Sequence, residues 1–332
     1  FLNDNLSELK IYNLRQELVL SDIMPILESF GFNIIKEYTY EVKPVEDTKV
    51  YIHYFNLNLC KYRNIFSART KGNFEKLITL ICNGVAEAGP LNRLVVGVEL
   101  SWKHICMITA YTKYLYQSGF RYSQSYIADI LSKNRDITRL IAELFETKFN
   151  PDLGVSLEER KEMVQKVNDK IESELSQVAD IASDTVIKKI LNAINSTLRT
   201  NYYQVIDESL NKKDGGYKGY ISFKFDSSKV SNLPLPLPYA EIFVYSASVE
   251  AIHLRGGKVA RGGLRWSDRH EDFRIEVLGL MKAQMTKNAV IVPVGSKGGF
   301  VVKKPTQTLS RDEVQEEGIK CYKTFLRGML DI

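Results

Sequence analysis

The chain has 332 residues, with 45 lysines and arginines against 40 acidic residues, four cysteines and four histidines. At about 100–200 residues per domain, this length predicts two or three domains, each large enough to bury its own core. The composition, 44% hydrophobic and 26% charged, is typical of a folded globular protein and excludes wholesale disorder. No apolar run approaches the roughly 20 residues of a membrane-spanning helix, and no secretion signal opens the chain.

The cysteines and histidines indicate neither a metal site nor a disulfide framework. The four cysteines form no C-x-x-C pair, and the four histidines lack metal-ligand spacing. This pattern fits a reducing, cytoplasmic compartment. Because the chain begins at Phe1 rather than Met and stops at Ile332, we also expect it to be an internal piece of a longer protein.

The first 62 residues predict a small α/β unit. Ser21 and Asp22 are candidate N-caps of a helix that ends near Gly31. Strands are expected over 32–42 and 50–57, joined by a turn.

Helical periodicity dominates residues 63–200. Ser156 and Glu159 have the spacing of a capping box at the beginning of a long helix. Trp102, Tyr111 and Tyr114 belong to one aromatic-rich helix, for which core packing is a better interpretation than ligand stacking.

Strand patterns return after residue 201. The expected strands cover 220–225, 241–245, 249–254, 290–294 and 300–303. A helix is expected over about 271–289, and the glycines within 295–299 predict a turn.

Basic residues and glycines concentrate between His253 and Lys304. This segment contains eleven lysines and arginines but four acidic residues, a local excess of +7 in a chain whose net charge is +5. It also contains eight of the 20 glycines. Cations interleaved with paired glycines favour a site where backbone and positive charge approach an anion. A basic surface with tight turns is the alternative interpretation.

Three short elements of this segment could form such a site. The candidate residues are the run Arg261, Gly262 and Gly263, the helical neighbours Gln284 and Lys287, and Lys297 in the glycine-rich turn. Separate cations can bind the two ends of a dicarboxylate. A lysine crowded by other cations gives up its proton more easily, which suits chemistry on a carbonyl or an imine.

Two other anion-binding interpretations fit less well. The Arg-Gly-Gly runs at Arg255 and Arg261 lack the length and low complexity of an RNA-binding tail, so no nucleic-acid partner is expected. Gly follows Lys297 where a phosphate loop has Ser or Thr, and the chain has no G-x-G-x-x-G dinucleotide fingerprint. The residues alone therefore predict an anion site on a strand–helix–strand unit.

The run from Val244 to Lys303, which includes ARGGLRWSDRHEDFR and VPVGSKGGF, resembles the NAD-specific glutamate dehydrogenases of the large bacterial class. Shorter runs near residues 20–28, 92–95 and 198–202 are similar to the same family, so the resemblance covers nearly the whole chain.

The resemblance implies an α+β or α/β multi-domain fold. Residues 1–62 would be the end of an ACT-like α/β module and 63–200 a helical linker. Residues 201–332 would begin the substrate-binding part of the catalytic domain, a mixed sheet with helices. The catalytic aspartate and the NAD-binding domain would follow this segment, so no NAD-binding residue is expected within it.

The resemblance also implies an activity. The parent protein would oxidise L-glutamate to 2-oxoglutarate and ammonia with NAD, as a cytoplasmic homo-oligomer without a membrane partner and with a possible amino-acid effector at its ACT-like region. The implied roles are side-chain carboxylate binding for Arg261 with Gly262 and Gly263, α-carboxylate binding for Gln284 and Lys287, and catalysis for Lys297.

Two departures from the related hexameric enzymes matter. Arg261 replaces a lysine, which keeps the charge but supplies a planar fork suited to bidentate carboxylate binding. The turn at Lys297 lacks one glycine, which leaves its placement relative to Lys287 open. The alternative function is a non-catalytic regulatory or assembly segment that binds an amino acid or a partner subunit.

Overall fold

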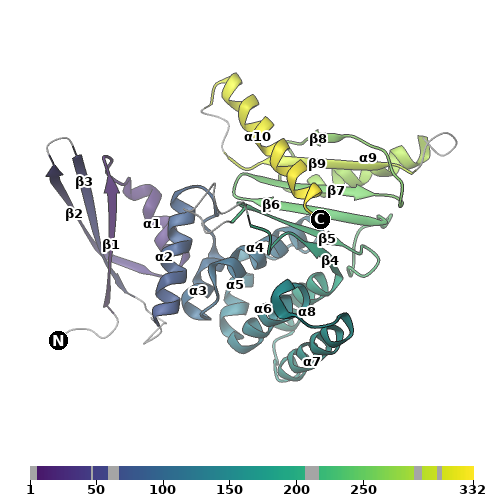
Figure 1. Ribbon diagram of the computed structural model, residues 1–332, viewed down its shortest axis with the longest axis horizontal. Coiled ribbons are helices and arrows are strands. Elements are labelled where there is room, and N and C mark those ends of the chain that lie inside the picture. The colour runs from purple at the N-terminus through teal and green to yellow at the C-terminus, as the bar shows by residue number, and fades with distance from the viewer. Residues whose placement is uncertain (1–5, 46–47, 59–66, 206–216, 288–293, 305–308) are drawn as a thin grey trace. The chain divides into compact units, whose positions relative to one another are not determined.

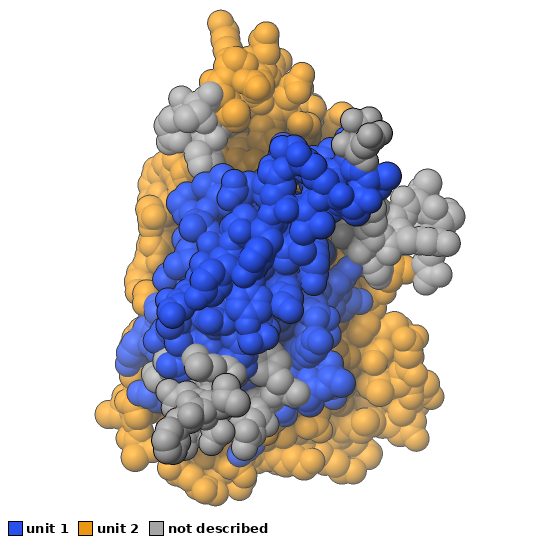
Figure 2. All heavy atoms as spheres, turned by 90° about the vertical axis from the view of Figure 1, so that its left-hand side faces the viewer, with its two compact units in different colours: residues 1–82, 88–105, 124–136 blue, residues 83–87, 106–123, 137–332 orange. Residues whose placement is uncertain are grey.

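The computed structural model describes residues 6–45, 48–58, 67–205, 217–287, 294–304 and 309–332. The chain divides into two compact units, each built from several segments (Figure 2). Unit 1 consists of Phe1–Cys82, Ala88–Ile105 and Gln124–Asp136, and unit 2 of Asn83–Glu87, Cys106–Ser123 and Ile137–Ile332.

Unit 1 contains a three-stranded antiparallel sheet (Figure 1). Its strands lie in the order β1 (Leu6–Leu14), β3 (Thr48–Asn58) and β2 (Asn33–Val45). The helices of this unit are α1 (Leu20–Ser29), α2 (Ala68–Cys82), α3 (Leu94–Gly97), which follows a 3₁₀ turn at Pro90–Arg93, and α5 (Gln124–Lys133).

Aromatic packing forms the core of unit 1. Phe30, at the end of α1, and Phe32 lie 4.8 and 5.4 Å from the ring of Phe74 on α2. The predicted helix and both predicted strands are confirmed, and Gly31 follows the helix with a φ of 84°. The predicted cap is wrong, because the N-cap residue is Val19, without a side-chain cap bond.

Unit 2 contains most of the remaining helices. They are α4 (Trp102–Gln117), whose first turn belongs to unit 1, α6 (Arg135–Phe149), α7 (Leu157–Leu175), α8 (Ile181–Ser196), α9 (Phe273–Lys287) and α10 (Arg311–Leu330), with a 3₁₀ turn at Pro151–Leu153. The capping box is confirmed, since Ser156 and Glu159 bond reciprocally at the beginning of α7. Asp180 caps α8 in a similar way, accepting from two backbone N–H groups.

A six-stranded mixed sheet is the centre of unit 2. Its strand order is β4 (Thr197–Thr200), β5 (Tyr220–Phe225), β6 (Ala240–Ser246), β7 (Val249–Arg255), β9 (Ser296–Val302) and β8 (Leu264–Trp266). All neighbours are antiparallel except β8 and β9, which are parallel and connected through α9. The expected α+β multi-domain class with a mixed sheet is therefore confirmed.

Helices cover both faces of this sheet (Figure 1). On one face, Tyr111 and Tyr114 of α4 stack on Phe223 and Phe225, with ring centroids 4.1 and 4.0 Å apart. This confirms the core interpretation of the aromatic helix. On the other face, Phe325 and its neighbours on α10 join the core cluster with residues of β6, β7 and β9.

A buried ion pair anchors α9 to the sheet. The guanidinium of Arg274 donates to Glu241 Oε2 on β6 at 2.8 and 3.0 Å, and Tyr114 Oη donates to Glu241 Oε1 at 2.6 Å. All three side chains have zero exposed surface. Burial raises the pKa of Tyr114 well above its usual value, so its hydroxyl stays a donor.

The predicted turn at 295–299 is wrong. Strand β9 begins at Ser296 and continues through Gly298 and Gly299. A Cβ on Gly298 would lie 2.3 Å from Leu264, and one on Gly299 would lie 2.5 Å from Val277 of α9. These glycines therefore reflect close packing on both faces of a strand rather than chain reversal.

The other predictions for this region have mixed outcomes. The strands at 220–225, 241–245 and 249–254 and the helix at 271–289 are confirmed in outline. The strand expected at 290–294 lies outside the described residues except for Val294, which is 38% exposed and not in a strand.

Replacing Arg274 with Met tests the buried ion pair. Removing one partner leaves the Glu241 carboxylate buried without its cation, and such a loss costs about 3–5 kcal/mol of stability. We expect urea unfolding of unit 2, followed by circular dichroism, to move to clearly lower urea. Lys161→Met, which removes an exposed pair with Glu158, should change the midpoint little. Equal midpoints for both variants would contradict the anchoring role.

Candidate functional site

The candidate site is built on the β8–α9–β9 unit. The backbone before β8 continues alongside the beginning of β9. Arg261 N donates to Val294 O at 3.1 Å, Ser296 N to Arg261 O at 3.0 Å, and Gly298 N to Gly263 O at 3.2 Å. These bonds bring the Arg261–Gly262–Gly263 run next to the strand that carries Lys297.

Gly262 allows this approach. A Cβ at this position would lie 1.4 Å from the carbonyl oxygen of Ser296, so no other residue fits without separating the two backbones. On the other side of β9, Gly256 N donates to Gly295 O at 3.0 Å. The site is therefore a place where three backbone segments meet with little side-chain bulk.

Lys297 reaches toward the glycine run. Its Nζ lies 3.9 Å from the point that a Cβ on Gly263 would occupy, and its side chain is partly exposed. Lys297 is the second residue of β9, opposite Leu254 of β7, rather than part of a turn. A strand position holds the ammonium more rigidly than a turn would.

Gln284 of α9 lies over the same end of β9. Its Cβ is 2.9 Å from the Cβ position of Gly295. Gly295 and Lys297 share one face of the strand because side chains alternate. The Oε1 atom of Gln284 is buried and has no hydrogen-bond partner among the described residues. A buried acceptor oxygen without a donor is unusual and marks a position where an N–H or O–H group of a ligand could bind.

The two remaining cations of the predicted site are Arg261 and Lys287. Arg261 has an exposed side chain that makes no ion pair with a described carboxylate. Lys287 is the last residue of α9, and its side chain lies outside the described part of the structure. The structure thus brings together Arg261, Gly262, Gly263, Gln284 and Lys297, and leaves the side chain of Lys287 unplaced.

The local excess of +7 overstates the charge of the site. Five of the eleven cations of this segment pair with carboxylates: Arg265 with Glu276, Arg269 with Asp272, Arg274 with Glu241, Lys303 with Glu87, and Lys304 with Glu317. Sequence counting cannot separate such structural cations from the unpaired ones. Within the described ranges, Arg261 and Lys297 make no ion pair.

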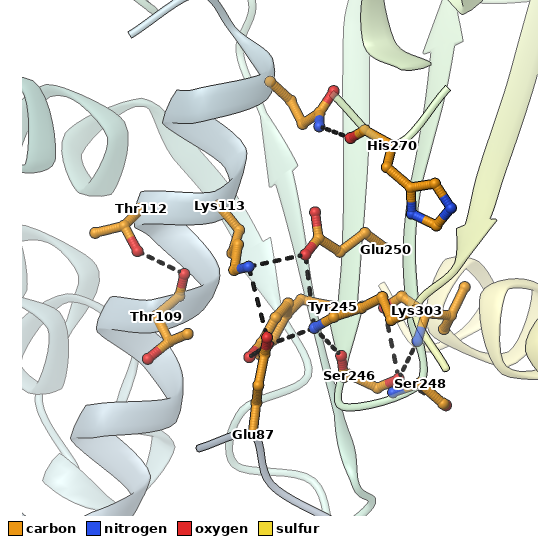
Figure 3. A network of polar contacts seen from close by, with 12 residues as sticks. Glu87, Thr109, Thr112, Lys113, Tyr245, Ser246, Ser248, Glu250, His270 and Lys303 are labelled. Atoms are coloured by element: carbon orange, nitrogen blue, oxygen red, sulfur yellow. Dashed lines mark hydrogen bonds and ion pairs between the residues drawn. The ribbon is translucent and has the colours of Figure 1, made fainter. Parts of the chain in front are cut away.

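Sequence reasoning missed a polar network at the far end of β9 (Figure 3). Lys303 Nζ donates to Glu87 and to Ser246 O, and lies 4.4 Å from the ring centroid of Tyr245. Lys113 of α4 lies 3.6 Å from Glu87 and 3.5 Å from Glu250.

This network fixes the carboxyl end of β9. Burial alone would raise the pKa of Glu87, but Lys303 and Lys113 outweigh it and hold the pKa below its usual value, so the carboxylate stays charged. Its members come from residues more than 200 positions apart, so no local sequence signal could have revealed it.

Two other kinds of feature are absent from the described ranges. No three histidine, cysteine or acidic side chains there are placed to hold a metal ion, and none of the helices is both long and apolar enough to cross a membrane. Cys82, Cys106 and Cys321 are free thiols.

Comparison with known proteins identifies the family. Residues 170–332 match the model "Bacterial NAD-glutamate dehydrogenase, catalytic domain", residues 86–151 match "Glutamate dehydrogenase, helical motif 3", and residues 3–67 match "Glutamate dehydrogenase, ACT3 domain". The chain belongs to the bacterial NAD-glutamate dehydrogenase family. This confirms the resemblance.

Curated relatives agree with this assignment. The NAD-specific glutamate dehydrogenase of Halomonas elongata is 43% identical to this chain over 98% of its length. That of Pseudomonas aeruginosa is 42% identical over 97%. That of Mycobacterium tuberculosis is 38% identical over 94%. The chain spans about a fifth of the length of these relatives, 19% for the first and 20% for the other two.

Two glycine substitutions distinguish the effect of close packing on stability from the effect of backbone entropy. Gly262→Ala places a methyl group against Ser296 O, so we expect separation of β8 from β9 and a clear loss of thermal stability. Gly279→Ala, in α9, meets no heavy atom within 4 Å and should stabilise the helix by about 0.5–1 kcal/mol. Thermal unfolding monitored by circular dichroism measures both, and the same sign of shift in both variants would refute the packing argument.

Proposed function

We propose that this chain supplies the substrate-binding part of an NAD-dependent glutamate dehydrogenase. The reaction converts L-glutamate, NAD⁺ and water into 2-oxoglutarate, ammonia, NADH and a proton. The observation that carries the proposal is the position of Lys297, whose ammonium lies beside Gly263 near the beginning of β9, where the buried Oε1 of Gln284 accepts no hydrogen bond from a described residue.

The two carboxylates of glutamate need separate cations. The exposed guanidinium of Arg261 is suited to bidentate binding of the side-chain carboxylate. Gln284 and Lys287, near the end of α9, would bind the α-carboxylate. In this arrangement the α-carbon would lie between the two groups, next to Lys297.

Lys297 would then act at the α-carbon. After hydride leaves this carbon, an imine remains, and water must add to it to form a carbinolamine. A neutral lysine amine can take a proton from that water, and the resulting ammonium can return a proton to the departing ammonia. Gly262 and Gly263 leave room for the substrate because they have no side chains.

NAD accepts the hydride in this proposal. The chain has no dinucleotide fingerprint, so none of its residues is assigned to NAD binding, and the steps above concern its own side chains.

The proposed domain organisation is an ACT-like module at 1–62, a helical linker at 63–200 and the beginning of the catalytic domain at 201–332. Support for a structural role of the linker comes from unit 2, where most of α4 and α6 and all of α7 and α8 cluster with the catalytic sheet. The homo-oligomeric state and the cytoplasmic location stay predictions.

Lysine substitutions in the full-length enzyme test the assigned roles. Lys297→Ala should lower kcat by about 10²–10⁴-fold, the usual contribution of a proton-transfer group. Lys287→Ala should mainly raise KM for glutamate, because it removes a cation that binds substrate. Steady-state kinetics with glutamate and NAD measure both.

Lys282→Ala is the matched control, since Lys282 is an exposed lysine on the same helix without a described ion pair. Its kcat and KM should equal those of the parent. Small and equal changes of kcat and KM in Lys297→Ala and Lys287→Ala would contradict the roles assigned to the two lysines.

A groove in unit 1 supports a second function, amino-acid binding. The groove has a volume of about 520 Å³ and is lined by the oppositely charged Lys71 and Glu75 of α2, beside apolar residues such as Phe32, Leu57 and Phe74. A zwitterion with a side chain could use both kinds of surface. An effector bound here would act apart from the Lys297 site.

Calorimetry tests this groove. We expect saturable binding of an amino acid that survives Lys297→Ala but weakens in Lys71→Ala, while Lys49→Ala, at the other end of the same sheet, binds as the parent does. A panel of amino acids that includes L-glutamate and L-aspartate identifies the ligand. Binding that disappears with Lys297→Ala would assign it to the substrate site instead.

A further inference from the structure

Three cations of unit 2 lie on the face of the sheet opposite Lys297. They are Arg199 of β4, Lys224 of β5 and Arg255 of β7. Arg199 is the register partner of Lys224. Between Lys224 and Arg255 lies β6, which contributes the uncharged Ile242 and Ala240 at the paired positions.

Neighbouring residues establish which face this is. Ser222, two positions before Lys224, approaches Gly328 of α10, and His253, two positions before Arg255, lies beside Phe325 of α10 around Gly298. Since alternate residues share a face, the three cations are on the α10 side. Lys297 is on the side that α9 covers.

No carboxylate balances these charges among the described residues. Arg199, Lys224 and Arg255 make no ion pair there, and Arg255 Nη2 donates to the backbone oxygen of Lys258 at 2.6 Å. Asp226 lies just beyond Lys224, but it accepts from Ser228 Oγ at 2.6 Å and pairs with Lys229 at 3.5 Å.

The neighbourhood responds to the uncompensated charge. Partial burial, followed by the positive charges of Arg199 and Arg255, lowers the pKa of Lys224. Burial and then Arg255 lower the pKa of His253 to about 4. His253 Nδ1 is also buried without a partner in the described structure.

Like charges held together on rigid strands repel, and an anion that contacts all of them relieves the repulsion. A single carboxylate could bind the guanidinium group of one arginine. Three cations match a ligand with at least two adjacent negative charges, and arginine forks fit phosphate oxygens well.

We propose that Arg199, Lys224 and Arg255 form a second anion site, which binds a phosphate-bearing ligand with two or more negative charges. This site is separate from the glutamate site because the sheet lies between them. It does not depend on the proposed reaction.

Titration calorimetry of the full-length enzyme tests the site. The probe is sodium pyrophosphate, at constant ionic strength and with saturating NAD, so that pyrophosphate does not report on the cofactor site. We expect saturable binding that weakens about tenfold or more in Lys224→Gln and in Arg255→Gln, because each loses a charge-assisted contact. Lys224→Arg should keep most of the affinity.

Two controls define the location. Lys161→Gln, an exposed lysine on α7, and Lys297→Gln should bind pyrophosphate as the parent does. ADP and inorganic phosphate, titrated in the same way, distinguish a nucleotide diphosphate from a free phosphate as the source of the anion. Circular dichroism of each variant checks that it is folded.

Two results would overturn the proposal. One is the absence of saturable binding for all three probes. The other is a loss of affinity in Lys297→Gln as large as in Lys224→Gln, which would assign the anion to the substrate site.

Discussion

The buried ion pair between Arg274 and Glu241 is the constraint on which the candidate site depends. A charge without solvent needs its partner nearby, and here Tyr114 completes the carboxylate's coordination. The pair fixes the first turn of α9 against β6. A helix of 15 residues is about 22 Å long and stiff, so fixing its beginning also determines where Gln284 lies over β9. The same pair joins α4 to the sheet through Tyr114, which makes the helical region a support of the site.

Close packing of glycines explains how polar groups gather at one end of the sheet. Gly262 lets the Arg261 run approach Ser296, and Gly298 and Gly299 let helices on both faces contact β9. Backbone segments that meet without side-chain bulk leave space for a substrate between fixed donors. Lys297 lies in this strand, whose far end is held by the Lys303 network (Figure 3). A lysine in a strand anchored at both ends has little freedom to move, which suits the role proposed for Lys297.

The distribution of charge shows what each level of analysis can resolve. Counting residues revealed a basic segment, and the family resemblance supplied roles for Arg261, Gln284, Lys287 and Lys297. Counting could not show that Arg274 is neutralised in the core. It also could not place Arg199 and Lys224, which lie outside the basic segment, on the same face of one sheet as Arg255. Cations become a site only when the fold leaves them without carboxylates, and strand order alone decides that.

The sequence by itself determined the elements whose signals are local. The capping box at Ser156, the alternating pattern of β5 and the dense family motif around Arg261 each lie within one short window. The tertiary structure decided everything that depends on distant partners. Gly298 and Gly299 predict a turn when considered as neighbours in sequence, yet they belong to a strand because α9 and α10 press on its two faces. Periodicity and capping arise from a few consecutive residues, whereas close packing and charge pairing join residues that only the folded chain brings together.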